Sequence, residues 1–127
     1  MKRSNEVQWN TTENETFRFL RSAWDVRKAK ELIAAKPRKV DEMSISGPAE
    51  LVGSPVGPTF VMGITVNWSR CESHEVNMDV PVILARRKDG THMPIDGWHR
   101  IAKAKMTGRT TLPCVVLTRK ESIQVEI

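Results

Sequence analysis

Five consecutive residues with the sequence DGWHR, Asp96–Arg100, bring an acid, a glycine, an indole, an imidazole and a guanidinium together where an apolar run gives way to a helical pattern. At the start of a helix, the amide groups of the first turn have no partner within the helix and carry the positive end of its dipole. Gly97 has no Cβ to keep a phosphate group from the backbone, and His99 and Arg100 would add side-chain donors. Lys103, one turn further on, would extend the positive field. This spacing favours a site for a phosphate group.

The same residues also suit a purely structural junction. Asp96 would then cap the helix and Gly97 would serve a turn. Trp98 would anchor the helix in the core, and Arg100 would be an ordinary surface residue. Residue types and spacing alone weight the two interpretations about equally, because short strand-to-helix motifs also recur without a function.

Two kinds of chemistry would be available around a bound phosphoryl group. Asp96 and His99, three residues apart, are the candidate catalytic pair, because both could face the group at the helix start and transfer a proton. Asp96 or Asp79 would also suit a magnesium ion, which often takes one or two carboxylates together with phosphate oxygens. Zinc is not expected, because Cys71 and His74 form one half-motif without a second pair at ligand spacing.

A hairpin, a helix and a strand would position this junction. The turn KDG lies between the runs VPVILAR and THMPI, and Asp89-Gly90 fits a tight turn in which glycine tolerates the positive φ. A helix should follow the junction and end at Gly108. The run TTLPCVVLT then predicts a buried strand, in which Cys114 acts as a small hydrophobic residue.

The first half of the chain predicts a helix over 23–36. Its apolar positions recur at helical spacing: Val26, Ala29, Leu32 and Ile33. Ser22 and Asp25 are expected to cap this helix and Pro37 to stop it.

The other segments are a loop, a strand and a tail. Three glycines and three prolines predict a loop over 47–58, β-branched residues predict a strand over 59–68, and alternation predicts an edge strand over 122–127. Together the elements predict one mixed α+β domain over 1–127, with a loosely ordered segment over 1–20.

Composition limits the class of protein and its partners. No apolar run approaches the about 18 residues that a membrane span needs, and the polar beginning lacks the apolar stretch of a secretory signal. We therefore expect a cytoplasmic protein without a membrane partner; the sequence does not indicate an oligomeric state. The net charge is +5, with eight basic and two acidic residues over 18–39 and nine and four over 86–127. This asymmetry would steer a nucleotide or a nucleic acid, although a solvated basic face is its commoner origin.

The tryptophans must supply most of the large aromatic core, because the chain has no tyrosine and three phenylalanines. Trp24 and Trp68 are assigned to that core. Trp98, beside the expected phosphate site, is the tryptophan most suited to touch a base or a ribose.

Residues 94–117, PIDGWHRIAKAKMTGRTTLPCVVL, resemble the ParB/sulfiredoxin superfamily. In that family a strand leads into a G-x-H-R or G-E-R-R element at a helix start, and a short apolar strand of the type x-I-P-x-x-V follows. Gly97, His99 and Arg100 match the first element, and LPCVV matches the second. The clearest similarity covers 79–118. It implies a small mixed-sheet fold with a phosphate-binding helix N-terminus.

The resemblance implies that Gly97, His99 and Arg100 contact nucleotide phosphates. Sulfiredoxins carry an Asp-x-x-Lys on the first helix, and Asp25 and Lys28 stand in that relation here, so Lys28 would close the site. The ligand would be a nucleoside triphosphate, ATP or CTP, with Mg²⁺, and the activity that of a nucleotide hydrolase or phosphotransferase. A DNA-binding or nuclease module, a label that the ParB-like family often carries, is one alternative. An inactive protein-interaction module is another.

The chain also departs from the family. Sulfiredoxins place their reactive cysteine between the glycine and the histidine, where this chain has Trp98, so sulfinic-acid repair is not expected. The glutamate of G-E-R-R is absent, which leaves a preference for CTP without support. The chain ends shortly after Thr118, so the helix-turn-helix and dimerisation regions of partition proteins are not expected.

Overall fold

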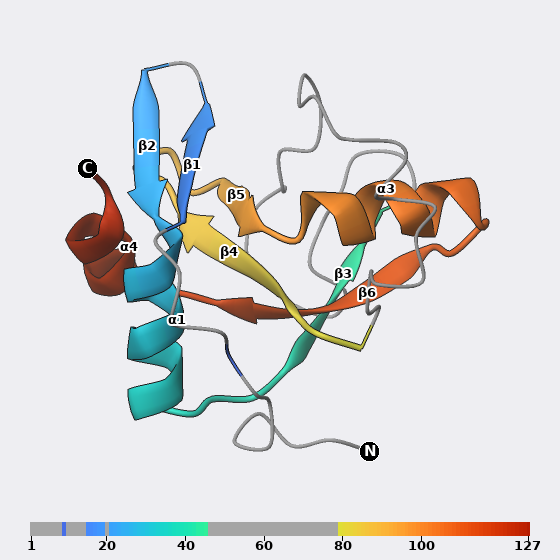
Figure 1. Ribbon diagram of the computed structural model, residues 1–127, viewed down its shortest axis with the longest axis horizontal. Helices are drawn as coiled ribbons and strands as arrows, with labels where there is room; N and C mark the ends of the chain where they lie inside the picture. The colour runs from blue at the N-terminus through green and yellow to red at the C-terminus, as the bar shows by residue number, and fades with distance from the viewer. Residues whose placement is uncertain (1–8, 10–14, 20, 46–78) are drawn as a thin grey trace.

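A computed structural model of the chain describes residues 9, 15–19, 21–45 and 79–127 (Figure 1). Over these residues the protein is a mixed α+β arrangement of three helices and two sheets, which confirms the α+β class. The helices are α1 (Val26–Ala35), α3 (Trp98–Met106) and α4 (Arg119–Val125). The strands are β1 (Thr16–Phe19), β2 (Ser22–Asp25), β3 (Asp41–Ser44), β4 (Val82–Arg86), β5 (His92–Asp96) and β6 (Thr111–Val116).

The larger sheet has the strand order β3-β6-β4-β5. β4 and β6 are its central strands and run parallel, with Val82 opposite Cys114, while β3 and β5 pair antiparallel at the edges. The first four residues of β4 are buried, as expected for a central strand with a continuous apolar sequence. β3 was not predicted, because its sequence DEMS carries little apolar signal; Met43 is its one buried residue.

The hairpin of β4 and β5 forms where the sequence predicts it. Its turn is closed by hydrogen bonds from the Arg87 amide to the Thr91 carbonyl (2.9 Å) and from the Gly90 amide to the Arg87 carbonyl (3.1 Å). The Asp89 carboxylate accepts from the hydroxyl and amide of Thr91, and these hydrogen bonds lower the pKa of Asp89. Gly90 has a φ of +86°, the left-handed conformation that the turn requires.

The predicted helix and strand after the hairpin are also present, as α3 and β6. Cys114 is fully buried on β6, as expected. Burial, reinforced by the carboxylates of Asp41 and Glu42, raises the pKa of the Cys114 thiol to about 12. This cysteine is therefore a packing residue, not a nucleophile.

The predicted helix over 23–36 begins later than expected. Asp25 is its N-cap, with the side chain accepting from the Lys28 amide at 3.0 Å, but the residues before it form β2, so Ser22 does not cap the helix. β2 pairs with β1, which lies within the segment expected to be loosely ordered. Aromatic stacking stabilises the β1–β2 pair: the Phe17 ring lies 5.9 Å from the Trp24 ring and 6.0 Å from the Trp98 ring, measured between centroids. Because Trp98 belongs to α3, this stacking holds the pair against that helix.

The strand predicted over 122–127 is wrong, because this segment contains most of α4. Thr118 and Glu121 form a complete capping box, with the Thr118 hydroxyl accepting from the Glu121 amide at 3.1 Å and the Glu121 carboxylate accepting from the Thr118 amide at 2.9 Å. The alternation that suggested a strand does not correspond to burial, since Val125 is buried while Ile123 and Ile127 are exposed. α4 packs against α1 and β4, and Figure 1 shows α1 and α4 next to one another.

Several predictions lie outside the described residues: the loop over 47–58, the strand over 59–68, and the side chains of Trp68, Cys71 and His74. Within the described ranges, no helix combines the length and the apolar character that crossing a membrane requires.

Candidate phosphate site at the Asp96–Arg100 turn

A single glycine separates β5 from α3. β5 ends at Asp96, α3 begins at Trp98, and Gly97 between them has a φ of +104°, which residues with a Cβ rarely adopt. The Ile101 amide donates to the Gly97 carbonyl at 3.0 Å and closes the first turn of the helix. The amide groups of residues 98–100 can have no carbonyl partner within α3. The predicted geometry of a glycine turn leading into a helix N-terminus is therefore present.

Arg100 folds back over this turn. Its Nη2 donates to the Asp96 carboxylate at 3.3 Å and to the Pro81 carbonyl at 3.2 Å. A Cβ built on Gly97 would lie 2.8 Å from Nη2 and 2.9 Å from the Val82 side chain, so the glycine is required for the guanidinium to lie there. The guanidinium thus covers the position at which an anion would approach the Gly97 backbone.

Both contacts of Nη2 are long. A charge-assisted N–H···O⁻ bond is usually about 2.7–2.9 Å, shorter than the 3.3 Å between Arg100 and Asp96. The Arg100 Nε atom is buried and has no hydrogen-bond partner among the described residues. Arg100 therefore has donor capacity that its protein partners do not use fully.

Of the two roles expected for Trp98, its surroundings fit the core anchor and not the contact with a base or a ribose. Trp98 is 8% exposed, its Nε1 donates to the Pro94 carbonyl at 2.6 Å, and its ring stacks on Phe17. An indole buried and stacked in this way is not an open surface for a base or a ribose. Trp98 instead anchors the start of α3 to the core and fixes the position of the turn.

The other predicted site residues are spread over several elements. His99 and Lys103 are both half-buried on α3, four residues apart and hence on neighbouring turns of one helix face. Lys28 is exposed near the start of α1, which packs against α4 and β1, whereas α3 packs against β6. Asp79 is exposed just before β4. The structure therefore brings Asp96, Gly97 and Arg100 into contact and places Lys28 on a separately packed helix.

The described residues of this turn include no cluster of metal-ligating side chains. In the ranges that the structure describes, no group of three or more His, Cys, Asp or Glu side chains is arranged to hold an ion. Asp96, the carboxylate of the turn, is already paired with Arg100.

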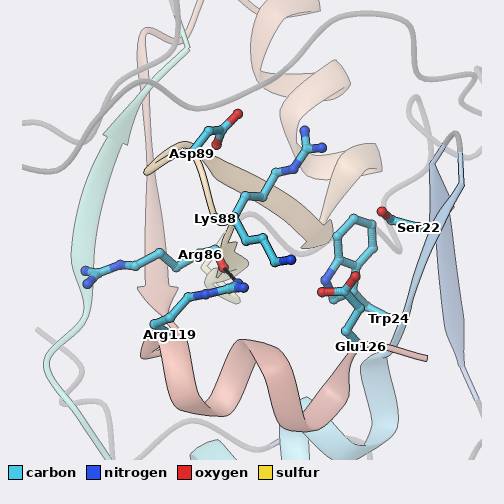
Figure 2. A pocket seen from close by; sticks show the side chains of 8 residues that line it. Ser22, Trp24, Arg86, Lys88, Asp89, Arg119 and Glu126 are labelled. Atoms are coloured by element: carbon cyan, nitrogen blue, oxygen red, sulfur yellow. Dashed lines mark hydrogen bonds between the residues drawn. The ribbon is translucent and has the colours of Figure 1, made fainter.

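One concave feature of the described residues was not predicted from the sequence. A pocket of about 280 Å³ opens between β2, the β4–β5 turn and α4, and four of its lining residues are basic: Arg86, Arg87, Lys88 and Arg119 (Figure 2). The sequence does show RRK next to the turn, but this run is joined to α4 only in the folded chain. The clustering of charge therefore could not be seen in the linear order.

Comparisons of the chain with protein-family models, with curated proteins and with solved structures gave no match. The resemblance to the ParB/sulfiredoxin superfamily therefore stays a prediction.

Proposed function

We propose that this chain is a nucleotide-binding domain of the ParB/sulfiredoxin type, and that its Asp96–Arg100 turn binds the phosphates. The observation that carries the proposal is the Arg100 guanidinium, which is held at a helix N-terminus by long contacts and whose Nε has no partner among the residues that the structure describes. The order of strand, glycine turn, helix and strand, β5 to β6, supports the family assignment.

The electrostatics of the turn suit an anion. The first-turn amides of α3 and the Arg100 guanidinium both place positive charge at the Gly97 turn. The Asp96 carboxylate pairs with Arg100 at 3.3 Å and so occupies the position proposed for the anion. A phosphate group carries more negative charge and more acceptor atoms than a carboxylate. Phosphate would therefore displace Asp96 from Arg100, and the guanidinium would move off the Gly97 backbone with it so that the phosphate accepts from the amides as well.

The displaced Asp96 carboxylate would be free to bind a metal ion. Once released from Arg100, Asp96 could ligate a magnesium ion that bridges the phosphates, in line with the preference of Mg²⁺ for one or two carboxylates plus phosphate oxygens. His99 and Lys103, on the same helix, are the further donors of the proposed site. Lys28 is left out, because its helix packs elsewhere.

The test is a calorimetric titration of ATP and of CTP into the protein, with and without Mg²⁺. Arg100→Gln should weaken binding about tenfold or more, the equivalent of losing one charge-assisted hydrogen bond. Arg109→Gln is the matched control, because Arg109 is an exposed arginine between α3 and β6. Thermal unfolding of both variants reports whether the fold is retained.

Two results would contradict the proposal. One is equal nucleotide affinity for the Arg100→Gln and Arg109→Gln variants. The other is the absence of nucleotide binding together with DNA binding that weakens steeply with added salt, which would favour a nucleic-acid-binding module.

A further inference from the structure

We infer that the basic pocket between β2, the β4–β5 turn and α4 is a separate binding site for a small phosphate monoester that carries hydroxyl groups. The pocket has a volume of about 280 Å³ and is lined by residues from three elements of the fold. No part of this inference depends on the phosphate site proposed at Gly97.

The two sites lie at opposite ends of one hairpin. Ile83 of β4 pairs with Asp96, next to the Gly97 turn, whereas Arg86 at the other end of β4 pairs with His92, next to the pocket. Three residues along a strand span about 10 Å. A ligand small enough for the pocket therefore does not reach Gly97, and the two sites can be tested independently.

Lys88 and Arg119 provide the positive charge that faces the pocket. Figure 2 shows the Lys88 ammonium group and the Arg119 guanidinium pointing toward the same space, from the β4–β5 turn and from α4. The Arg119 Nη1 donates to the Arg86 carbonyl at 2.8 Å, and the Arg86 amide in turn donates to the Ser122 hydroxyl at 2.8 Å. A guanidinium has five N–H donors. Among the described residues, Arg119 is therefore held in place through one nitrogen, and its further donors can serve a ligand.

The acidic residue of the turn does not neutralise this charge. The Asp89 carboxylate accepts from the Thr91 amide at 3.0 Å and from its hydroxyl at 2.6 Å. In Figure 2 it points away from the Lys88 ammonium group. Arg87 also lines the pocket, whereas Arg86 takes part through its carbonyl, because its guanidinium points away from Lys88 in Figure 2. The pocket thus keeps an excess of positive charge.

Besides a phosphate for the basic residues, the ligand needs hydroxyl groups for the Glu126 carboxylate. Its carboxylate lies beside the Trp24 side chain on the far side of the pocket from Arg119 (Figure 2). The backbone there is held by a bridge between Trp24 and Glu126 and by the hydrogen bond from the Ile127 amide to the Ala23 carbonyl, 2.8 Å long. A carboxylate repels a bare phosphate but accepts hydrogen bonds from hydroxyl groups. The matching ligand has a phosphate between Lys88 and Arg119 and hydroxyls on the Glu126 side.

The size of the pocket limits the ligand further. Sites for drug-sized molecules measure about 300–1,000 Å³, so 280 Å³ is at the lower limit. A phosphate with a short polyol fits such a volume, whereas a complete nucleoside triphosphate does not. We therefore take the ligand to be a small phosphorylated polyol.

The experiment titrates glycerol 3-phosphate, inorganic phosphate and glycerol into the full chain and follows binding by calorimetry. Glycerol 3-phosphate should bind, and more tightly than either fragment. Lys88→Gln should weaken it by about tenfold, because one charge-assisted contact is lost. Lys120→Gln is the matched control, since Lys120 is exposed on α4 outside the pocket. Glu126→Gln should shrink the preference for glycerol 3-phosphate over inorganic phosphate.

The outcomes separate this site from the proposed nucleotide site. Arg100→Gln should leave the binding of glycerol 3-phosphate unchanged. The inference is overturned if the wild-type chain does not bind glycerol 3-phosphate, or if the Lys88→Gln and Lys120→Gln variants bind it equally. It is also overturned if single-stranded DNA at the same phosphate concentration competes as well as the monoester, because the pocket would then be part of an open backbone-binding surface.

Discussion

The Arg38 guanidinium pairs with the Glu121 carboxylate through two nitrogens, joining positions 83 apart in the sequence. Arg38 follows α1, and Glu121 belongs to the capping box that starts α4, so this pair ties the two helices together. The Nη2–Oε2 distance is 2.9 Å, and both side chains are mostly buried. The hydrogen bonds from Arg38 hold the pKa of the Glu121 carboxyl below its ordinary value, more than offsetting the effect of its burial.

Glu121→Gln should lower the free energy of unfolding at pH 7 by about 2 kcal/mol, because a charge-assisted pair becomes a neutral contact beside a buried arginine. A carboxyl whose folded pKa is depressed stabilises the protein above its unfolded pKa and loses that contribution as the pH falls through the folded pKa. The difference between the variant and the wild type should therefore shrink below about pH 4.5. Urea denaturation at neutral and acidic pH measures it.

Asp41→Asn is the control for Glu121→Gln. Asp41 pairs with Lys39 at 3.8 Å, and the Lys39 side chain is 87% exposed, so this variant should change stability by less than about 0.5 kcal/mol. A loss for Glu121→Gln that is equally small, or that persists unchanged in acid, would show that the Arg38 pair is not a stabilising contact.

Gly97→Ala should destabilise the protein more than Gly108→Ala does. Both glycines have positive φ, +104° and +77°, so both alanines strain the backbone. A Cβ at Gly108 would meet nothing within 4 Å, whereas one at Gly97 would lie 2.8 Å from Arg100 and 2.9 Å from Val82. We expect a loss of about 1 kcal/mol for Gly108→Ala and about 3 kcal/mol for Gly97→Ala, measured by thermal unfolding. Equal losses would mean that the close approach of Arg100 to the Gly97 backbone does not exist in solution.

Asp96→Asn should strengthen nucleotide binding in the absence of Mg²⁺. Asp96 competes with a phosphate for the Arg100 guanidinium in the proposed site, and the amide is a weaker competitor. The expected gain is about threefold to tenfold in the dissociation constant, which corresponds to about 1 kcal/mol. Titration with ATP in a chelating buffer measures it. A weaker affinity would show that Asp96 helps to hold the nucleotide directly instead of shielding Arg100.

The elements around the turn could be predicted because their signals are local. The apolar run of β4, the Asp89-Gly90 turn and the stop at Gly108 each act within a few residues. The strand prediction for residues 122–127 is wrong because two local signals compete in that segment. Alternation favoured a strand, but the capping box of Thr118 and Glu121 favours a helix, and its pairing with Arg38 depends on a distant segment. The β1–β2 pair depends on the stacking of Phe17 between Trp24 and Trp98, which the sequence does not specify.

At the site, the sequence predicted the residue types and the glycine turn but not what the side chains do. The position of Arg100 depends on the Pro81 carbonyl, and β4 lies beside the turn only through strand pairing. Trp98 was assigned to a ligand because of its neighbours in the sequence, whereas Phe17, which covers it, is far away in the chain. Contacts between residues far apart in the sequence therefore determine both the position of Arg100 and the burial of Trp98.

Amide chemical-shift mapping by NMR tests the central claim most directly, because it locates the nucleotide on the backbone. Titration of the labelled protein with ATP should shift the amides of residues 97–101 first and most, and Arg100→Gln should remove these shifts. Shifts confined to other residues, such as the β4–β5 turn and α4, with residues 97–101 unmoved at saturation, would contradict phosphate binding at the Gly97 turn.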